Sequence, residues 1–352
     1  MNKNALKESA LAALRAGGGF YLSRRSRWRK ERLLILCYHG FTLEDEHEWN
    51  GYLYMSRERF RERLELLKQG GYNVLRLDEA FTRLQEGSLP ERSVVITVDD
   101  GTYDFYRTAY PLLQEYRFPA TVYLTTYYCL QNDPVFMPAL LYLLWKSGKP
   151  ELDVGKWVPG QGSLPLRNTA ERLHAGKVVL EWTTRQNITS AGKTELLMAV
   201  AADLGASYEH LKQSRQFHVM NPEEVREISR DSAMDIELHT HRHRTPLDRD
   251  LFLREIRDNR RAIEEITGRS TRHFCYPSGQ YDASFLPWLR EEGVITATTC
   301  RIELADRTQN PLLLPRYVDT MYQSRLRFES WCSGAARLLP RSEAYRYEEA
   351  SE

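Results

Sequence analysis

The chain has 352 residues, of which 42% are hydrophobic and 28% charged, and its formal net charge is +1. This balance supports a folded core of one or two domains and excludes the basic excess on which non-specific nucleic-acid binding depends. The five cysteines are odd in number and form no Cys-x-x-Cys pair, which favours reduced thiols over a disulfide framework.

The first 32 residues are expected to form a helix followed by a basic connector. Apolar residues recur at helical spacing within residues 4–15, and residues 24–30 are rich in arginine. The segment lacks the apolar core of a signal peptide, and no run reaches the roughly 18 apolar residues of a membrane span, so we expect a cytoplasmic protein. The basic stretch with Trp28 is interpreted either as a solvated connector or as a contact with a membrane surface or a lipid-linked glycan.

From residue 33 the chain alternates between strand and helix patterns. Apolar runs predict eight strands, which start near residues 33, 72, 94, 120, 234, 272, 294 and 312. This βα order predicts an α/β fold, a (β/α) barrel. Residues 127–218 break the alternation after the fourth strand, and we interpret them as an insertion that shapes the substrate site and not as an independent domain. The predicted parts are the connector 1–32, the barrel 33–322 and a helical, finally frayed tail 323–352.

Three of the predicted strands end in residues that suit catalysis. One runs directly into Asp99, Asp100 and Gly101, another leads into His239 and His243, and the first ends at His39. Because the carboxyl ends of barrel strands meet at one face, we expect these side chains to lie close together. An Asp-Asp-Gly sequence alone also forms ordinary turns, and a single His-x-x-x-His pair is weak evidence for a metal site. The prediction therefore depends on their combination.

Such a set of residues can bind a divalent cation. Two imidazoles and one carboxylate can ligate Zn²⁺, the expected ion, or Co²⁺, Ni²⁺, Mn²⁺ or Fe²⁺. Three protein ligands leave other coordination positions of the ion open. The second aspartate could take a proton from an attacking water, and His39 could protonate a leaving amine. A backbone N–H within residues 277–279 could stabilise the oxyanion. The predicted chemistry is metal-assisted hydrolysis of an amide or an ester.

These motifs resemble those of the polysaccharide deacetylase (NodB-homology) family of carbohydrate esterases. Residues 97–101, Thr-Val-Asp-Asp-Gly, are similar to its Thr-Phe-Asp-Asp-Gly signature, and residues 239–243, His-Thr-His-Arg-His, match its His-[Ser/Thr]-x-x-His motif. Residues 276–279, Tyr-Pro-Ser-Gly, resemble its third motif. The resemblance covers roughly residues 33–126 and 220–320 and implies a distorted (β/α) barrel.

The resemblance also implies roles for the matched residues. Asp99 would be the catalytic base, and the Ser278 N–H would donate to the oxyanion. Three residues would ligate the metal: Asp100, His239 and His243. Three more would contact the substrate: Tyr276, Pro277 and Gly279.

The chain departs from the family pattern in three places. Val98 replaces a phenylalanine, which a strand tolerates. Cys275 replaces the arginine of the third motif, so we expect Arg316, near the last strand, to orient Asp99. A C-terminal Leu-x-His motif is missing, and we assign the acid role to His39, because Tyr38-His39 resembles the branch that acts on biofilm exopolysaccharides.

The sequence therefore predicts a metal-dependent deacetylase that removes N-acetyl groups from amino sugars of a polysaccharide or its precursor and releases acetate. Three alternatives remain: an O-acetyl esterase, a hydrolase of a small non-sugar amide, and an inactive carbohydrate-binding module. The expected partner is an N-acetylated saccharide and not a nucleic acid.

Overall fold

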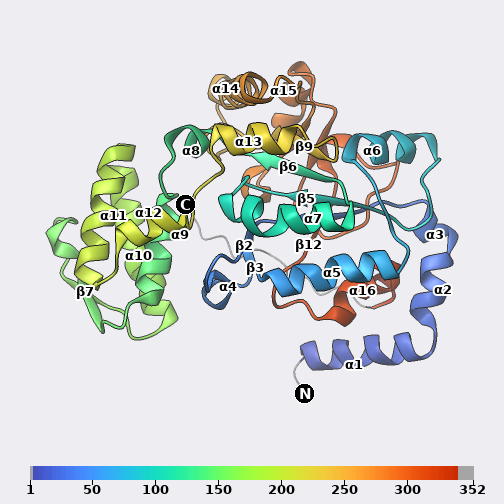
Figure 1. The fold of residues 1–352 in the computed structure, drawn as a ribbon, viewed down its shortest axis with the longest axis horizontal. Coiled ribbons are helices and arrows are strands. Elements are labelled where there is room, and N and C mark those ends of the chain that lie inside the picture. The colour runs from blue at the N-terminus through green and yellow to red at the C-terminus, as the bar shows by residue number, and fades with distance from the viewer. Residues whose placement is uncertain (1–2, 340–352) are drawn as a thin grey trace. The chain divides into compact units, whose positions relative to one another are not determined.

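The computed structural model describes residues 3–339 (Figure 1). The described chain divides into two compact units, one made of residues 3–130 and 220–339, the other of Gln131–Val219. The first unit contains the three predicted catalytic strand ends. The predicted frayed end of the chain lies outside the described residues.

The first unit is built on a parallel sheet in which all eight predicted strands are present. Its strands are β1 (Leu34–Tyr38), β4 (Asn73–Val74), β5 (Ser93–Val98), β6 (Ala120–Leu124), β9 (Met234–Leu238), β10 (His273–Cys275), β11 (Thr296–Thr298) and β12 (Tyr317–Val318). Their order is β11-β10-β9-β6-β5-β1-β12, and β4 pairs with the start of β5. The chain before β12 closes the ring, because Leu314 exchanges backbone hydrogen bonds with Ala297 and Thr299 while Tyr317 pairs with Leu36. The predicted distorted (β/α) barrel is therefore confirmed.

Helices surround these strands (Figure 1). They are α5 (Arg57–Gln69), α6 (Leu77–Glu86), α7 (Tyr110–Tyr116), α8 (Thr126–Gln131), α13 (Pro222–Ser229), α14 (Arg249–Thr267), α15 (Phe285–Glu291) and α16 (Arg325–Ser333). All of β5 is buried, as expected for a parallel strand covered on both faces. The apolar face of α6 packs against inward-facing residues of the strands, including Ile35, Val95 and Tyr123. This cluster forms an apolar floor beneath the strand ends.

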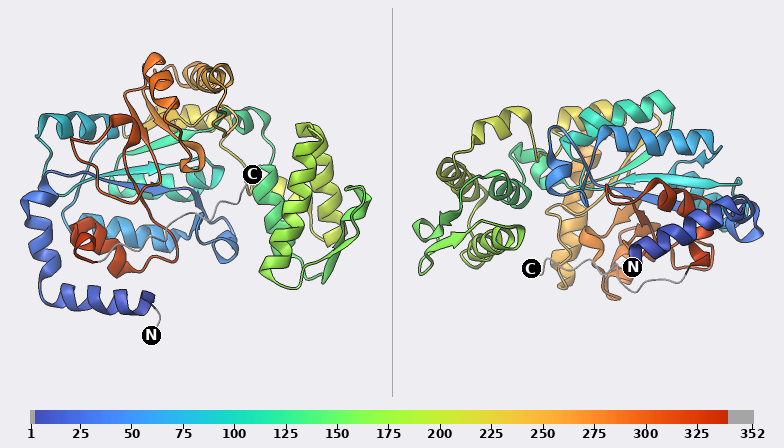
Figure 2. Two further views of the ribbon diagram at one scale, coloured as in Figure 1. Left: turned by 180° about the vertical axis from the view of Figure 1, so that it is seen from behind. Right: turned by 90° about the horizontal axis from the view of Figure 1, so that it is seen from below.

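The N-terminal segment forms three helices: α1 (Lys3–Ala16), α2 (Gly19–Arg25) and α3 (Arg27–Lys30). Helix α1 lies beside α16 (Figure 2). The basic stretch is largely paired within the molecule: Lys30 pairs with Glu91, and the buried Arg29 donates to three backbone carbonyls. Trp28 packs against the guanidinium groups of Arg32 and Arg337. These contacts favour the connector interpretation, and membrane contact stays a prediction.

Across the residues that the structure describes, we find no helix with the length and apolar character needed to cross a membrane. The cytoplasmic location stays a prediction.

The second unit contains helices α9 (Phe136–Lys146), α10 (Thr169–Arg185), α11 (Ser190–Leu204) and α12 (Tyr208–Ser214), with an antiparallel hairpin of β7 (Glu151–Asp153) and β8 (Ser163–Pro165). Helix α9 buries Leu140, Leu143 and Leu144 and contacts both α10 and α11. A Cβ at Gly176 of α10 would lie 2.3 Å from Leu141 Cδ2, so glycine permits the close approach of these helices. The segment therefore has a core of its own. Its interpretation as an insertion that shapes the substrate site stays a prediction.

Candidate active site

The two adjacent aspartates follow β5 and point to different partners. The Asp99 N–H donates to Tyr38 O at 2.9 Å, which extends the pairing of β5 with β1 to the catalytic residue itself. Asp100 and Gly101 then take φ of 69° and 70°. A Cβ at Gly101 would lie 2.4 Å from Leu124 Cδ1, so only glycine fits this turn. The turn directs Asp99 into the barrel and Asp100 towards the loop after β9.

Asp100, His239 and His243 form a candidate cation site. Asp100 Oδ1 lies 3.2 Å from the Nε2 atoms of both histidines, and the three ligand atoms lie within 4.8 Å of one another. This oxygen is buried and makes no hydrogen bond. Although burial opposes ionisation, the two imidazoles, His243 foremost, hold the pKa of the Asp100 carboxyl well below its usual value. An oxygen that faces two ring nitrogens without a hydrogen bond fits a shared divalent cation with two nitrogen ligands and one oxygen ligand.

A second layer of contacts orients His239. Its Nδ1 lies 2.9 Å from Cys275 O, an arrangement that turns Nε2 towards Asp100. Its backbone N–H donates to Asn259 Oδ1 at 2.9 Å, and the Asn259 amide donates to Leu124 O. Asn259 therefore ties β9 to β6 at the site. Asn259 is buried on the face of α14 that also carries Phe252, Ile256 and Ile263, and a polar residue on such a face is a sequence signal for this role.

The loop between the two histidines is held by a buried carboxylate. Glu255 accepts hydrogen bonds from Arg242 N at 2.7 Å and from Arg244 Nε at 2.8 Å. Within the loop, Thr240 and His243 take positive φ values, 61° and 55°, which non-glycine residues rarely adopt. The contacts with Glu255 stabilise this strained path. Sequence reasoning missed Glu255, because one acidic residue among many on a charged helix carries no distinct pattern.

Arg316 binds Asp99 through two hydrogen bonds. Nη1 lies 2.6 Å from Oδ1 and Nη2 lies 2.7 Å from Oδ2, while Nε donates to Thr299 O. Burial alone would raise the pKa of Asp99, but the Arg316 guanidinium, aided by His39 and His239, lowers it below the ordinary carboxyl range. Cys275 Sγ lies 3.1 Å from Arg316 Nη2. The small cysteine side chain thus lies where Arg316 reaches Asp99 from the segment before β12, as the sequence led us to expect.

His39 lies on the other side of Asp99. Its Nε2 is 3.6 Å from Asp99 Oδ2, and burial lowers the pKa of His39 despite the opposing charges of Asp99 and Asp100. The next residues form β2 (Gly40–Phe41), which pairs with β3 (Tyr54–Met55). Phe41 N donates to the buried carboxyl group of Asp104 at 2.8 Å. Sequence reasoning did not identify Asp104, which connects the loop after β5 to the segment that carries His39.

The third motif, residues 276–279, is partly buried. Tyr276 and Pro277 are buried, and the Tyr276 hydroxyl donates to Leu312 O at 3.1 Å. Substrate contact by these two residues stays a prediction. The aromatic ring fills the space between β10 and the chain before β12, which its position in the motif alone did not indicate. Ser278 is exposed, with φ of 56°, and Gly279 lies against Cys300, so both are near the strand ends.

His241 lies in the same loop but outside the ligand set. Its Nδ1 is 2.9 Å from Thr126 Oγ1, and the Tyr127 ring packs edge-on against it. With these contacts, His241 faces Thr126 and Tyr127 and not Asp100.

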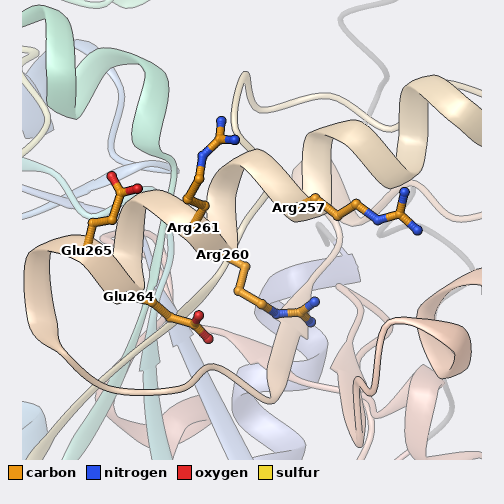
Figure 3. Close-up of a pocket in the computed structure, with 5 residues that line it drawn as sticks. All are labelled: Arg257, Arg260, Arg261, Glu264 and Glu265. Atoms are coloured by element: carbon orange, nitrogen blue, oxygen red, sulfur yellow. The ribbon is translucent and has the colours of Figure 1, made fainter.

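A shallow hollow on the outer face of α14 is separate from this site (Figure 3). It is lined by Arg257, Arg260, Arg261, Glu264 and Glu265. The first two arginines pair with Glu292 and the third with Asp258, so the described contacts already neutralise much of its charge.

Comparison with known proteins agrees with the geometry. The polysaccharide deacetylase family model matches residues 86–151 and 199–297, which contain the aspartate pair and the histidine loop. Over these residues the chain is similar to the polysaccharide deacetylase family. This family is typically metal-dependent, and the Asp100, His239 and His243 set is compatible with that property.

Two solved structures share the fold of this chain. The Streptococcus pyogenes deacetylase PplD in complex with acetate is 18% identical with a TM-score of 0.55, and the match covers 84% of this chain and 96% of that chain. IcaB from Ammonifex degensii is 19% identical with a TM-score of 0.53, and the match covers 87% of this chain and 96% of that chain.

A curated relative resembles a shorter part of the chain. The poly-β-1,6-N-acetyl-D-glucosamine N-deacetylase of Staphylococcus aureus (strain MSSA476) is 35% identical over 72 residues, which cover 20% of this chain and 25% of that protein. The chain spans between 14% and 32% of the length of the curated relatives that it matches.

Proposed function

We propose that this protein is a metal-dependent N-deacetylase that acts on N-acetylated amino sugars of a polysaccharide or its precursor and releases acetate. The observation that carries the proposal is the convergence of Asp100, His239 and His243 on one point beside the ionised Asp99. Both the metal ligands and the base are required, because this hydrolysis needs a Lewis acid and a proton acceptor.

The three ligands would hold the cation through one oxygen and two nitrogen atoms. The bound cation would supply Lewis acidity, which activates water and polarises the acetyl carbonyl. This mixed ligand set suits Zn²⁺ first, and Co²⁺, Ni²⁺, Mn²⁺ or Fe²⁺ as alternatives. Metal analysis of the purified protein identifies the ion.

Asp99 would accept the proton of the attacking water. Its lowered pKa keeps the carboxylate ionised across the working pH range, and Arg316 fixes both of its oxygens, so Arg316 is a positioning residue. His39 would donate a proton to the leaving amine. Because burial lowers the pKa of His39, its protonated form gives up that proton readily. The Ser278 N–H would donate to the oxyanion.

The substrate is inferred from the named relative, a poly-β-1,6-N-acetyl-D-glucosamine N-deacetylase. We therefore propose an N-acetylglucosamine polymer or its precursor as the substrate, in a pathway of exopolysaccharide synthesis. Either the amide or an acetyl ester could be presented to the same set of residues, so the assay includes both.

The test measures acetate release from N-acetylglucosamine oligomers and from O-acetylated saccharides, with the metal-loaded protein. We expect release from the N-acetylated oligomers, a loss of at least about 100-fold in Asp99→Asn, and no bound metal in His239→Ala. His241→Ala is the matched control, because it alters the same loop outside the ligand set, and it should stay active. Acetate release that Asp99→Asn leaves unchanged would refute the proposal, and release from the esters alone would favour the esterase.

A further inference from the structure

The most exposed aromatic side chains gather near the strand ends. Among the described residues, four tyrosines count as exposed: Tyr21, Tyr52, Tyr281 and Tyr322. Tyr21 lies on α2. Tyr52 lies between α4 (Glu46–Trp49) and β3, and the other two lie in loops that follow β10 and β12, at the barrel end that holds the candidate active site.

Two of these tyrosines form a pair. Tyr52 and Tyr322 are each 58% exposed, and their ring centroids are 4.6 Å apart with an interplanar angle of 58°. They belong to loops that are 270 residues apart in the chain, and the pairing of β1 with β12 brings the neighbouring strands together. Neither loop alone creates this surface.

The pair is held in place by the backbone beneath it. Met321 N donates to Gly51 O at 2.9 Å. A Cβ at Gly51 would lie 3.0 Å from Met321 Cβ and 3.2 Å from Tyr322 Cζ, so the two loops are in close contact. The rings therefore stand on a preformed support, which lowers the entropic cost of binding a ligand.

The two loops adjoin the strands that supply the site. Tyr52 lies in the connection, which includes α4, from β2 to β3, and β2 directly follows His39. The loop with Tyr322 follows β12, which comes directly after Arg316. The pair thus lies on the His39 side of the site.

We propose that Tyr52 and Tyr322 form a subsite for sugar units next to the reacting one. This inference rests on the proposed function. A pyranose ring has an apolar C–H face and polar edges, and tyrosine offers an aromatic face with a hydroxyl that can hydrogen-bond. A patch of two rings is too small for a stable protein interface or for membrane docking, both of which bury several hundred Å² or more. A saccharide chain that extends from the site is the occupant of matching size and chemistry.

The test compares Tyr52→Ala, Tyr322→Ala and the double variant over N-acetylglucosamine oligomers from the monosaccharide to the hexasaccharide. For the long oligomers we expect KM to rise about fivefold in each single variant with kcat unchanged. The shortest substrate that is turned over should show no change. Tyr52→Phe should retain most of the affinity, and Tyr21→Ala, which removes an exposed tyrosine on α2, is the matched control.

Equal losses on short and long substrates would indicate a structural role and overturn the subsite. No change at any length would overturn it as well, and so would a changed oligomeric state of the variants, which would indicate contact with a second copy of the chain. If the wild type releases no acetate, the proposed function fails, and calorimetric titration with the hexasaccharide tests the subsite separately. Weaker binding by Tyr52→Ala would then support the subsite, and equal binding or no binding would refute it.

Discussion

Replacement of Arg316 by methionine would remove the counterion of Asp99 while retaining most of the length of the side chain. Both residues are buried, and two short hydrogen bonds join them. Loss of one partner from a buried pair typically costs about 3–5 kcal/mol, because the remaining charge is left without compensation. We expect Arg316→Met to lower the free energy of unfolding by about that amount at neutral pH.

The pKa of Asp99 determines how the stability of each protein changes with pH. In the wild type the folded-state pKa of Asp99 lies below the unfolded value, so the ion pair stabilises the fold above the ordinary carboxyl pKa and loses its effect as the pH falls through the lowered one. Without Arg316, burial becomes the dominant influence and raises the pKa of Asp99. The variant should then lose stability as the pH rises, and the acid limb of kcat/KM should shift to higher pH, because Asp99 must be ionised to accept a proton.

Urea denaturation at several pH values measures the first effect, and the pH profile of acetate release measures the second. The double variant Asp99→Asn with Arg316→Met is the control for stability, because it contains no uncompensated carboxylate. It should be more stable than Arg316→Met alone. Arg316→Lys retains the charge but loses the paired geometry, so it should keep the acid limb better than it keeps kcat. An unchanged acid limb in Arg316→Met would refute the proposed link between Arg316 and the ionisation of Asp99.

Three further predictions concern the metal site and its support. Chelation of the metal should abolish acetate release, and addition of Zn²⁺ or Co²⁺ should restore it in the same assay. Full activity in the metal-free protein would contradict the ligand assignment. Glu255→Gln should weaken metal binding by about 10–100-fold with kcat retained at saturating metal, because Glu255 orients the histidine loop without touching the cation. Isothermal titration measures the metal affinity. An affinity equal to that of the wild type would show that the loop keeps its conformation without Glu255. Burial raises the pKa of Asp104 to about 8, above its value of about 4 in the unfolded chain, so stability should fall as the pH rises between these values. Asp104→Asn keeps an acceptor for Phe41 N and should flatten that fall in thermal melts at pH 5 and pH 9; a parallel decline in both proteins would assign the effect to another group.

Local sequence patterns determined much of the barrel. An apolar run such as residues 94–98 indicates a strand that is buried on both faces. The spacing of such runs was enough to predict eight strands. The ends of those strands also pointed to one face, so Asp99, Asp100 and the histidine loop could be expected to meet. These signals depend only on the order of residues along one short segment, which a sequence contains directly.

The tertiary structure decided which side chains support the site and which are simply buried. The contacts of Glu255 with the histidine loop, of Asp104 with Phe41, and of Tyr52 with Tyr322 join segments whose proximity depends on the packing of whole elements. The burial of Tyr276, which its motif did not indicate, has the same origin, because the chain before β12 covers it. The hydrophobic periodicity of a segment predicts that a residue is buried. The element that buries it depends on the long-range closure of the barrel.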